Sequence, residues 1–129
     1  MSNNSESIGA KKLQMADIFF HEVEDGIIIT TSEGSVVDLN PAFSKIIGYS
    51  REEVVGKVPD FLKSDSQNMI YYNDILKTIS IKGRWAGVLK VKTKSGEDLA
   101  GRLTIVAVKN HDKQTTNYIG FLRLADVQV

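Results

Sequence analysis

Alternating apolar and polar residues dominate the second half of the chain and predict three long strands. Between Trp85 and Lys94, lysines alternate with apolar or β-branched residues, so this strand has one wet and one dry face. The next predicted strand, Asp98 to Lys109, carries apolar residues on both faces, and a third runs from Asn117 to Leu124. We therefore expect a sheet that is covered on both sides.

Two shorter apolar runs lie earlier in the chain, at residues 27–31 and 36–39, and a Ser-Glu-Gly-Ser segment separates them. This arrangement predicts a tight hairpin. Asn40 and Pro41 follow directly, with Asn40 suited to an N-cap and Pro41 to the first helical position. The sequence therefore predicts five strands in all, with two short helices after the second. The other short helix is indicated by the capping-box spacing of Ser50 and Glu53.

Apolar residues spaced by three and four predict two longer helices. One covers residues 11–24 and is amphipathic, so we expect it to pack across the outer face of the sheet. The other covers residues 67–81. Residues 1–10 are rich in Ser and Asn and are predicted to be a disordered leader, which leaves 25–127 as the core domain.

Composition narrows the possible functions. The chain has 129 residues, 42% of them hydrophobic, which suits one domain with one core. Sixteen basic residues balance sixteen acidic ones, so no net field attracts nucleic acid or an anionic membrane. No apolar run approaches the roughly 18 residues of a spanning helix, and we expect a cytoplasmic protein. The absence of cysteine excludes disulfides, thiolate nucleophiles and Cys-ligated metals.

Four phrases carry a family resemblance in the expected order: DGIIIT from Asp25, NPAF from Asn40, GYSREEVVGK from Gly48 and GRWAGVLKVKTKSGE from Gly83. Together they resemble a PAS domain over Asp17 to Val127, similar to those that precede bacterial histidine kinases or diguanylate cyclases. The resemblance implies an α+β fold with a five-stranded antiparallel sheet and helices on its concave face. It also implies sensing and no catalysis, so no catalytic residue and no metal site is predicted.

A cavity between the helices and the sheet is the predicted ligand pocket. Its expected lining is Phe43, Ile47, Phe61, Leu62, Met69, Tyr72, Leu76, Trp85, Leu89, Leu103 and Leu122. The same side chains could instead form a filled core, because protein interiors pack closely. Trp85 in particular could either stack on a ligand or simply pack.

The resemblance also bears on cofactors. The flavin photosensors of the family need a cysteine where this chain has Pro59, so covalent flavin chemistry is excluded. Haem needs an axial ligand, and the only histidines, His21 and His111, fall in the first helix and in a turn. A non-covalent flavin is allowed but unsupported, because the redox sensors of the family carry polar groups near positions 91 and 102, where this chain has Val91 and Arg102.

The sequence thus favours a non-catalytic sensory module that binds a small ligand or a partner and relays a conformational signal to a downstream effector. By the resemblance, Asp126 would mark the exit of that signal. The apolar residues that predict a homodimer are Leu13, Phe20 and Val23, packed against Val106 and Val108.

Two alternatives stay open. One is a PAS dimerisation module with a filled core and no ligand. The other is a small enzyme of cone-shaped α+β architecture, similar to ketosteroid isomerases, which requires a carboxylate in an apolar pocket. The best apolar faces of this sequence carry no acidic residue, which disfavours the enzyme.

Overall fold

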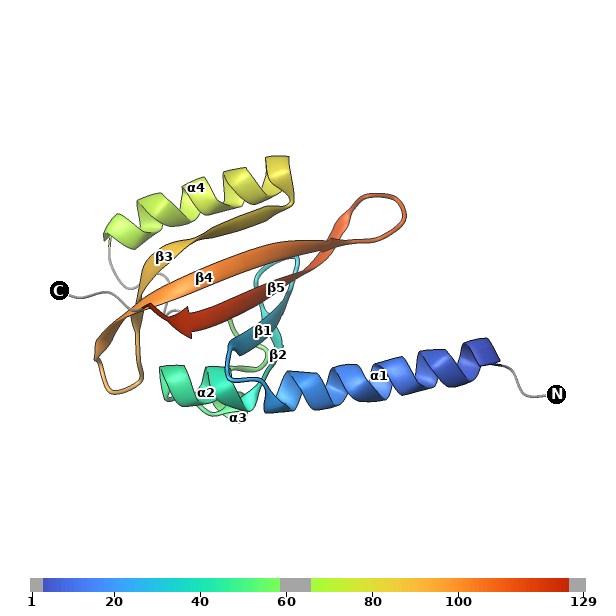
Figure 1. The fold of residues 1–129 in the computed structure, drawn as a ribbon. Helices are drawn as coiled ribbons and strands as arrows, with labels where there is room; N and C mark the ends of the chain where they lie inside the picture. Colours follow the sequence, from blue (N-terminus) through green and yellow to red (C-terminus); the bar gives the residue numbers. More distant parts are fainter. Residues whose placement is uncertain (1–3, 59–65, 126–129) are drawn as a thin grey trace.

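One five-stranded antiparallel sheet forms the body of the domain in the computed structural model, which describes residues 4–58 and 66–125 and the side chains of 8–58 and 73–125. The strand order is β2-β1-β5-β4-β3 (Figure 1). The strands are β1 Gly26–Thr31, β2 Val36–Leu39, β3 Arg84–Lys92, β4 Asp98–Lys109 and β5 Thr115–Leu124. The predicted α+β fold with five antiparallel strands is confirmed.

The helices are α1 Asn4–Glu22, α2 Pro41–Ile47, α3 Arg51–Val54 and α4 Ser66–Lys82. In Figure 1, α4 runs alongside β3, whereas α2 and α3 lie near β1 and β2. Contacts of α4 with β3 and β4, and of α2 with β1 and β5, place both helices against the inner face of the sheet.

The core lies between these helices and the inner face. Leu103 and Leu122 are opposite each other on β4 and β5, and both are almost completely buried. Phe43 from α2 and Ile75 and Ile79 from α4 pack onto them. Because side chains on a strand alternate between faces, the core residues of the long strands are spaced two apart, as Leu103 and Ile105 are on β4.

Short capping motifs fix the two helices that follow the hairpin. The Asn40 side chain accepts a hydrogen bond from the Phe43 N–H, and Pro41 occupies the first helical position, as predicted. Gly48 ends α2 in a left-handed conformation with φ of 80°. Ser50 and Glu53 then form a complete capping box at the start of α3.

The position of α1 differs from the prediction. The helix begins at Asn4, inside the segment predicted to be a disordered leader, and it extends away from the sheet instead of crossing its outer face (Figure 1). Within the described residues its main contact is with α2. Leu13 is 74% exposed, and Ile18 and Phe19 are also exposed, so apolar residues project on several sides of α1 and no single stripe fixes it to the sheet.

Candidate ligand cavity between the sheet and α4

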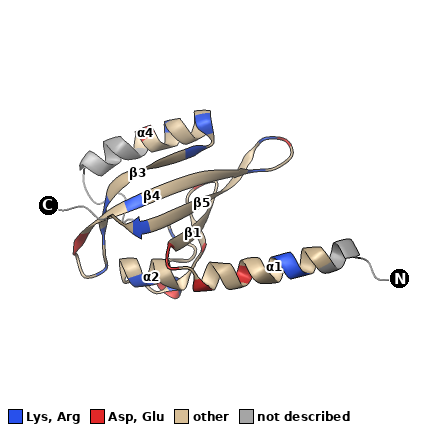
Figure 2. Cartoon of the chain, in the orientation of Figure 1, with Lys and Arg blue, Asp and Glu red and all other residues tan. Residues whose placement is uncertain are grey.

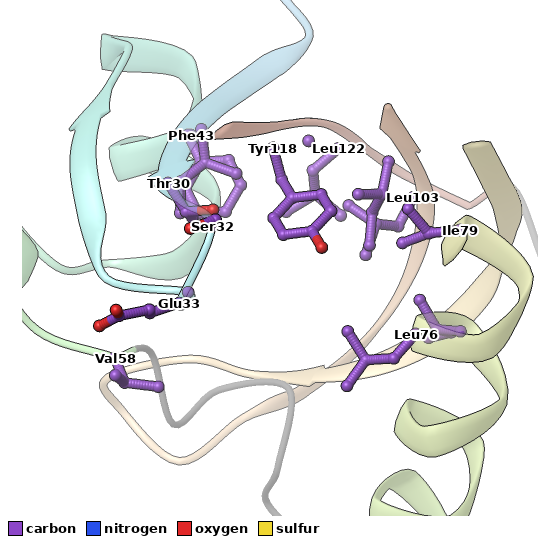
Figure 3. Close-up of a pocket in the computed structure, with 15 residues that line it drawn as sticks. Thr30, Ser32, Glu33, Phe43, Val58, Leu76, Ile79, Leu103, Tyr118 and Leu122 are labelled. Atoms are coloured by element: carbon purple, nitrogen blue, oxygen red, sulfur yellow. The ribbon is translucent and has the colours of Figure 1, made fainter. Parts of the chain in front are cut away.

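A cavity of about 190 Å³ lies between the inner face of the sheet, α4 and the turn that joins β1 to β2 (Figure 3). The described residues that line it are Ile28, Thr30, Ser32, Glu33, Gly34, Phe43, Val58, Ile75, Leu76, Ile79, Leu103, Ile105, Tyr118, Gly120 and Leu122. Most of this lining is apolar, which is typical of small-molecule sites.

A glycine in the central strand leaves room on the cavity floor. Gly120 of β5 pairs with Ile28 of β1 on one side and with Ile105 of β4 on the other. A Cβ atom at this position would lie 2.8 Å from Cγ2 of Ile28 and 3.7 Å from Cδ1 of Leu103. Because Gly120 has no side chain, the side chains of Ile28 and Leu103 can lie close to its backbone, and the space above Gly120 remains part of the cavity.

Three of the four polar side chains that line the cavity lie at the hairpin end. Thr30, Ser32 and Glu33 come from β1 and the following turn, and Tyr118 comes from β5. Figure 3 shows the Tyr118 hydroxyl pointing into the open centre, with Leu76 across from it. The Thr30 hydroxyl donates to the carbonyl oxygen of Thr31 at 2.9 Å. The cavity therefore has polar side chains at its hairpin end, a tyrosine hydroxyl at its centre and an apolar wall opposite.

Four of the residues predicted to line a pocket do line this cavity. Phe43 projects from α2, Leu76 from α4, and Leu103 and Leu122 from neighbouring strands. Elements that are far apart in the sequence thus meet around one space, as expected for the side of the sheet that the helices cover.

Three other predicted residues belong to the packed core and lie outside the cavity lining. Ile47 and Leu89 are buried in the main cluster, and Trp85 packs against that cluster while remaining partly buried. The backbone of Ile47 accepts a hydrogen bond from the Lys94 N–H at 2.9 Å, which holds the end of α2 against the turn between β3 and β4. Close packing fills the space at this end of the sheet.

The remaining predicted lining residues cannot be placed. Phe61 and Leu62 lie outside the described residues, as does Asp126, and the side chains of Met69 and Tyr72 are not among those described.

Several lining residues were missed by the sequence prediction. Leu122 was expected to face inward, and the two-residue period of a strand puts Tyr118 and Gly120 on the same face. This two-residue period could have predicted that Tyr118 and Gly120 line the cavity. The contribution of Ser32 and Glu33 carried no such signal, because it depends on how the hairpin turn bends over the end of the cavity.

One buried amide joins α1 to the domain. Asn40 is 0% exposed, and its Oδ1 accepts from the N–H of Ile27 at 2.8 Å and from that of Phe43 at 2.9 Å. Its Nδ2 donates to the carbonyl oxygens of Phe20 at 2.9 Å and Asp25 at 3.0 Å. A single side chain therefore links the end of α1, the start of β1 and the first turn of α2.

Ion pairs on the surface connect the α3 region to neighbouring turns. Lys94 Nζ donates to Glu53 Oε2 at 2.6 Å, and this bond, with the Ser50 N–H, lowers the pKa of Glu53 to about 2. Arg51 Nε donates to Asp38 Oδ1 at 2.6 Å, and this hydrogen bond raises the pKa of Arg51. Figure 2 shows acidic and basic residues close together in this part of the molecule and along α1.

The Glu53 pair predicts a specific acid sensitivity. Because the pKa of Glu53 falls from 4.5 to about 2 on folding, its stabilisation is complete above pH 4.5 and is lost as the pH drops towards 2. As the pH falls from 4.5 to 2, the melting temperature of Glu53→Gln should therefore decrease less than that of the wild type. The effect is small, since the side chains of Lys94 and Glu53 are 53% and 38% exposed and solvent screens the pair.

Thermal melts followed by circular dichroism between pH 5 and pH 2 measure this difference. Glu97→Gln, an exposed carboxylate in the turn after β3, is the matched control and should keep the wild-type profile. Parallel acid profiles for wild type and Glu53→Gln would contradict the assignment.

Comparison with known proteins shows which family has this sequence pattern and architecture. The family model described as PAS domain matches residues 24–123. The high affinity cAMP-specific and IBMX-insensitive 3',5'-cyclic phosphodiesterase 8A of Homo sapiens is 25% identical over 103 residues, 80% of this chain and 12% of that protein. The nitrogen fixation regulatory protein of Klebsiella oxytoca is 25% identical over 118 residues, 89% of this chain and 24% of that protein.

A solved PAS domain from Colwellia psychrerythraea has the same fold. Its TM-score is 0.79 at 22% identity, and the match covers 88% of this chain and 96% of that one. The chain spans less than a quarter of the length of the two relatives, which are larger proteins that contain a similar segment. None of the helices in the described part of the chain is long and apolar enough to cross a membrane. With a family model matched across the sheet and its helices, the chain belongs to the PAS domain family.

Proposed function

We propose that this PAS domain is a non-catalytic sensory module that binds a small ligand in the cavity between α4 and the sheet. The observation that carries the proposal is the cavity itself, which is mostly apolar, with a few polar groups at one end. A closely packed core leaves little empty space, so a cavity of about 190 Å³ favours a sensor over a module whose core is filled.

The volume limits the size of the ligand. An apolar cavity of about 150 Å³ holds a benzene molecule, and sites for drug-sized ligands begin near 300 Å³. The 190 Å³ cavity therefore suits a single ring with a small substituent. A flavin or a haem is far larger, so the size of the cavity supports neither cofactor.

The signal would leave through elements attached to the cavity walls. Phe43 lines the cavity, and its backbone N–H is bonded to Asn40, which also holds the end of α1. A ligand that favours one packing of α2 would therefore bias the position of α1. We further infer that the domain acts within a longer signalling protein, with a kinase or a cyclase as the effector and Asp126 at the exit. The cytoplasmic location stays a prediction.

Self-association is the second part of the proposal. The outer face of the sheet is not covered by its own α1, and Val106 and Val108 on that face are half-buried. The exposed apolar surface of α1, which includes Leu13, extends away from the domain. We propose that Leu13 and Phe20 of α1, with Val23 directly after the helix, pack against the outer face of a second copy.

Light scattering at tens of micromolar protein tests the dimer. Wild type should be dimeric, and Leu13→Lys should shift the population towards monomer because it places a charge in the contact. Gln14→Lys adds the same charge to the next exposed position of α1 and should leave the dimer intact. A monomeric wild-type protein would overturn this part of the proposal.

Filling the cavity tests ligand binding. Leu76→Trp adds bulk at the cavity wall, and Val88→Trp introduces the same side chain on the outer face, at a residue that is also 41% exposed. Wild type and Val88→Trp should show saturable thermal stabilisation by small monocyclic compounds, and Leu76→Trp should lose it. If a panel of such compounds stabilised none of the three proteins, the ligand-free dimerisation module would be favoured instead.

A further inference from the structure

The lining of the cavity narrows the class of ligand, an inference that rests on the proposed function. From the positions of its polar and apolar groups we infer that the site takes an uncharged, hydroxylated monocycle of the phenol type. Its ring would lie against the apolar wall, and its hydroxyl would bond to Tyr118.

The apolar wall comes from α4 and β4. Ile75, Leu76 and Ile79 project from α4, and Leu103 and Ile105 project from β4. This surface offers no hydrogen-bonding side chain, so the part of a ligand that faces it has to be hydrocarbon. Its residues are branched aliphatic side chains, which suits contact with a flat ring.

Tyr118 supplies the polar contact. It lies in the middle of β5, paired with Thr30 of β1 and Ala107 of β4, so its backbone is fixed on both sides. Its ring packs against the core, and its hydroxyl points into the open centre of the cavity (Figure 3). No side chain in the described part of the protein bonds to this hydroxyl, which is therefore available to donate or to accept.

The charge of the lining argues against an anionic ligand. Glu33 is the one charged residue in the described lining, and Figure 3 shows its carboxylate turned away from Tyr118 at the edge of the cavity. A ligand carboxylate would lose its hydration without meeting a described cation, and Glu33 would repel it. A neutral hydroxyl meets neither cost.

Three ring compounds of similar size, phenol, toluene and benzoate, separate the effects of the ligand hydroxyl, the apolar ring and a negative charge on binding. Isothermal titration with wild type should give phenol about five- to tenfold tighter than toluene, the ratio expected for one net hydrogen bond. Benzoate should show no saturable binding. Tyr118→Phe should bind toluene as wild type does and should lose the preference for phenol.

Tyr49→Phe is the matched control, because Tyr49 also packs partly buried against the core but lies outside the cavity lining. It should keep the preference for phenol. Equal affinities of wild type for phenol and toluene would overturn the inference while leaving ligand binding intact, and so would tighter binding of benzoate. If wild type bound none of the three compounds, and if no monocyclic compound stabilised wild type, Val88→Trp or Leu76→Trp against heat, the proposed function would be overturned as well.

Discussion

Replacing Asn40 by alanine should lower the free energy of unfolding by about 4 kcal/mol, a large part of the stability of a small domain. The side chain caps α2, and loss of such a cap costs about 1 kcal/mol. Alanine would also remove hydrogen-bond partners of the buried Ile27 N–H and of the partly buried carbonyl oxygens of Phe20 and Asp25. Each unsatisfied buried group costs roughly 1–3 kcal/mol.

Urea unfolding followed by circular dichroism measures this loss. Asn110→Ala is the matched control, because the Asn110 side chain bonds to the N–H groups of Asp112 and Gln114, both at 3.0 Å, but in an exposed turn. We expect a loss below about 1 kcal/mol there. Similar losses for the two variants would show that the burial of Asn40 has no special weight.

Two further substitutions separate the roles of the Asn40 amide. Asn40→Ser keeps an oxygen that can cap α2 but loses the donors to α1, so we expect an intermediate loss. Asn40→Asp keeps the shape but directs a carboxylate at the carbonyl oxygens of Phe20 and Asp25, so it should be at least as damaging as alanine. In both variants, limited proteolysis should cut α1 faster than in wild type.

The strands and caps could be predicted because they follow from local rules. Alternation of lysines with apolar residues is enough to locate β3, and the Asn40-Pro41 pair is enough to locate the start of α2. The ends of all five strands lie within two residues of the predicted positions, since turn residues interrupt the pattern there. In this part of the fold, local preference and tertiary packing agree.

The placement of α1 could not be predicted because its apolar residues are compatible with more than one partner. Phe20, at the end of α1, is half-buried, whereas Leu13 is largely exposed. The spacing of the apolar residues does not indicate which surface the rest of the helix contacts. A surface on a second copy would satisfy the pattern as well as the sheet of the same chain. Hydrophobic periodicity indicates that the apolar face of a helix is covered, but it does not identify the surface that covers it.

The cavity was only partly predictable for a related reason. Phe43 and Leu103 face inward by periodicity, but periodicity gives a direction and not the distance to the opposite wall. Whether two inward-facing side chains touch depends on the angle of α4 and on the bend of the β1–β2 turn. The sequence therefore left a filled core and a cavity equally open.

Adding one methyl group at Gly26 should cost about 2–3 kcal/mol. A Cβ atom there would lie 2.9 Å from the Cα of Phe43, with two atoms of the Phe43 side chain at 3.0 and 3.1 Å. Because the nearest atom belongs to the backbone of α2, a change of rotamer cannot remove the contact, and the helix itself has to shift away from β1. Overpacking of this kind typically costs 1–3 kcal/mol, and a backbone shift lies at the upper end.

Chemical unfolding of Gly26→Ala gives the magnitude, and a second variant identifies the cause. If the Phe43 side chain were responsible for the clash, Phe43→Leu combined with Gly26→Ala would recover much of the loss; we expect little recovery, since the Cα of residue 43 stays in place. Gly9→Ala is the matched control, because Gly9 lies in α1 with no atom within 4 Å of its Cβ position. That substitution should leave stability unchanged or raise it by up to about 1 kcal/mol through helix propensity. A Gly26→Ala domain as stable as the Gly9→Ala domain would mean that α2 can move away from β1 at no cost, and the route from the cavity to α1 through Phe43 and Asn40 would then lack the rigid packing it requires.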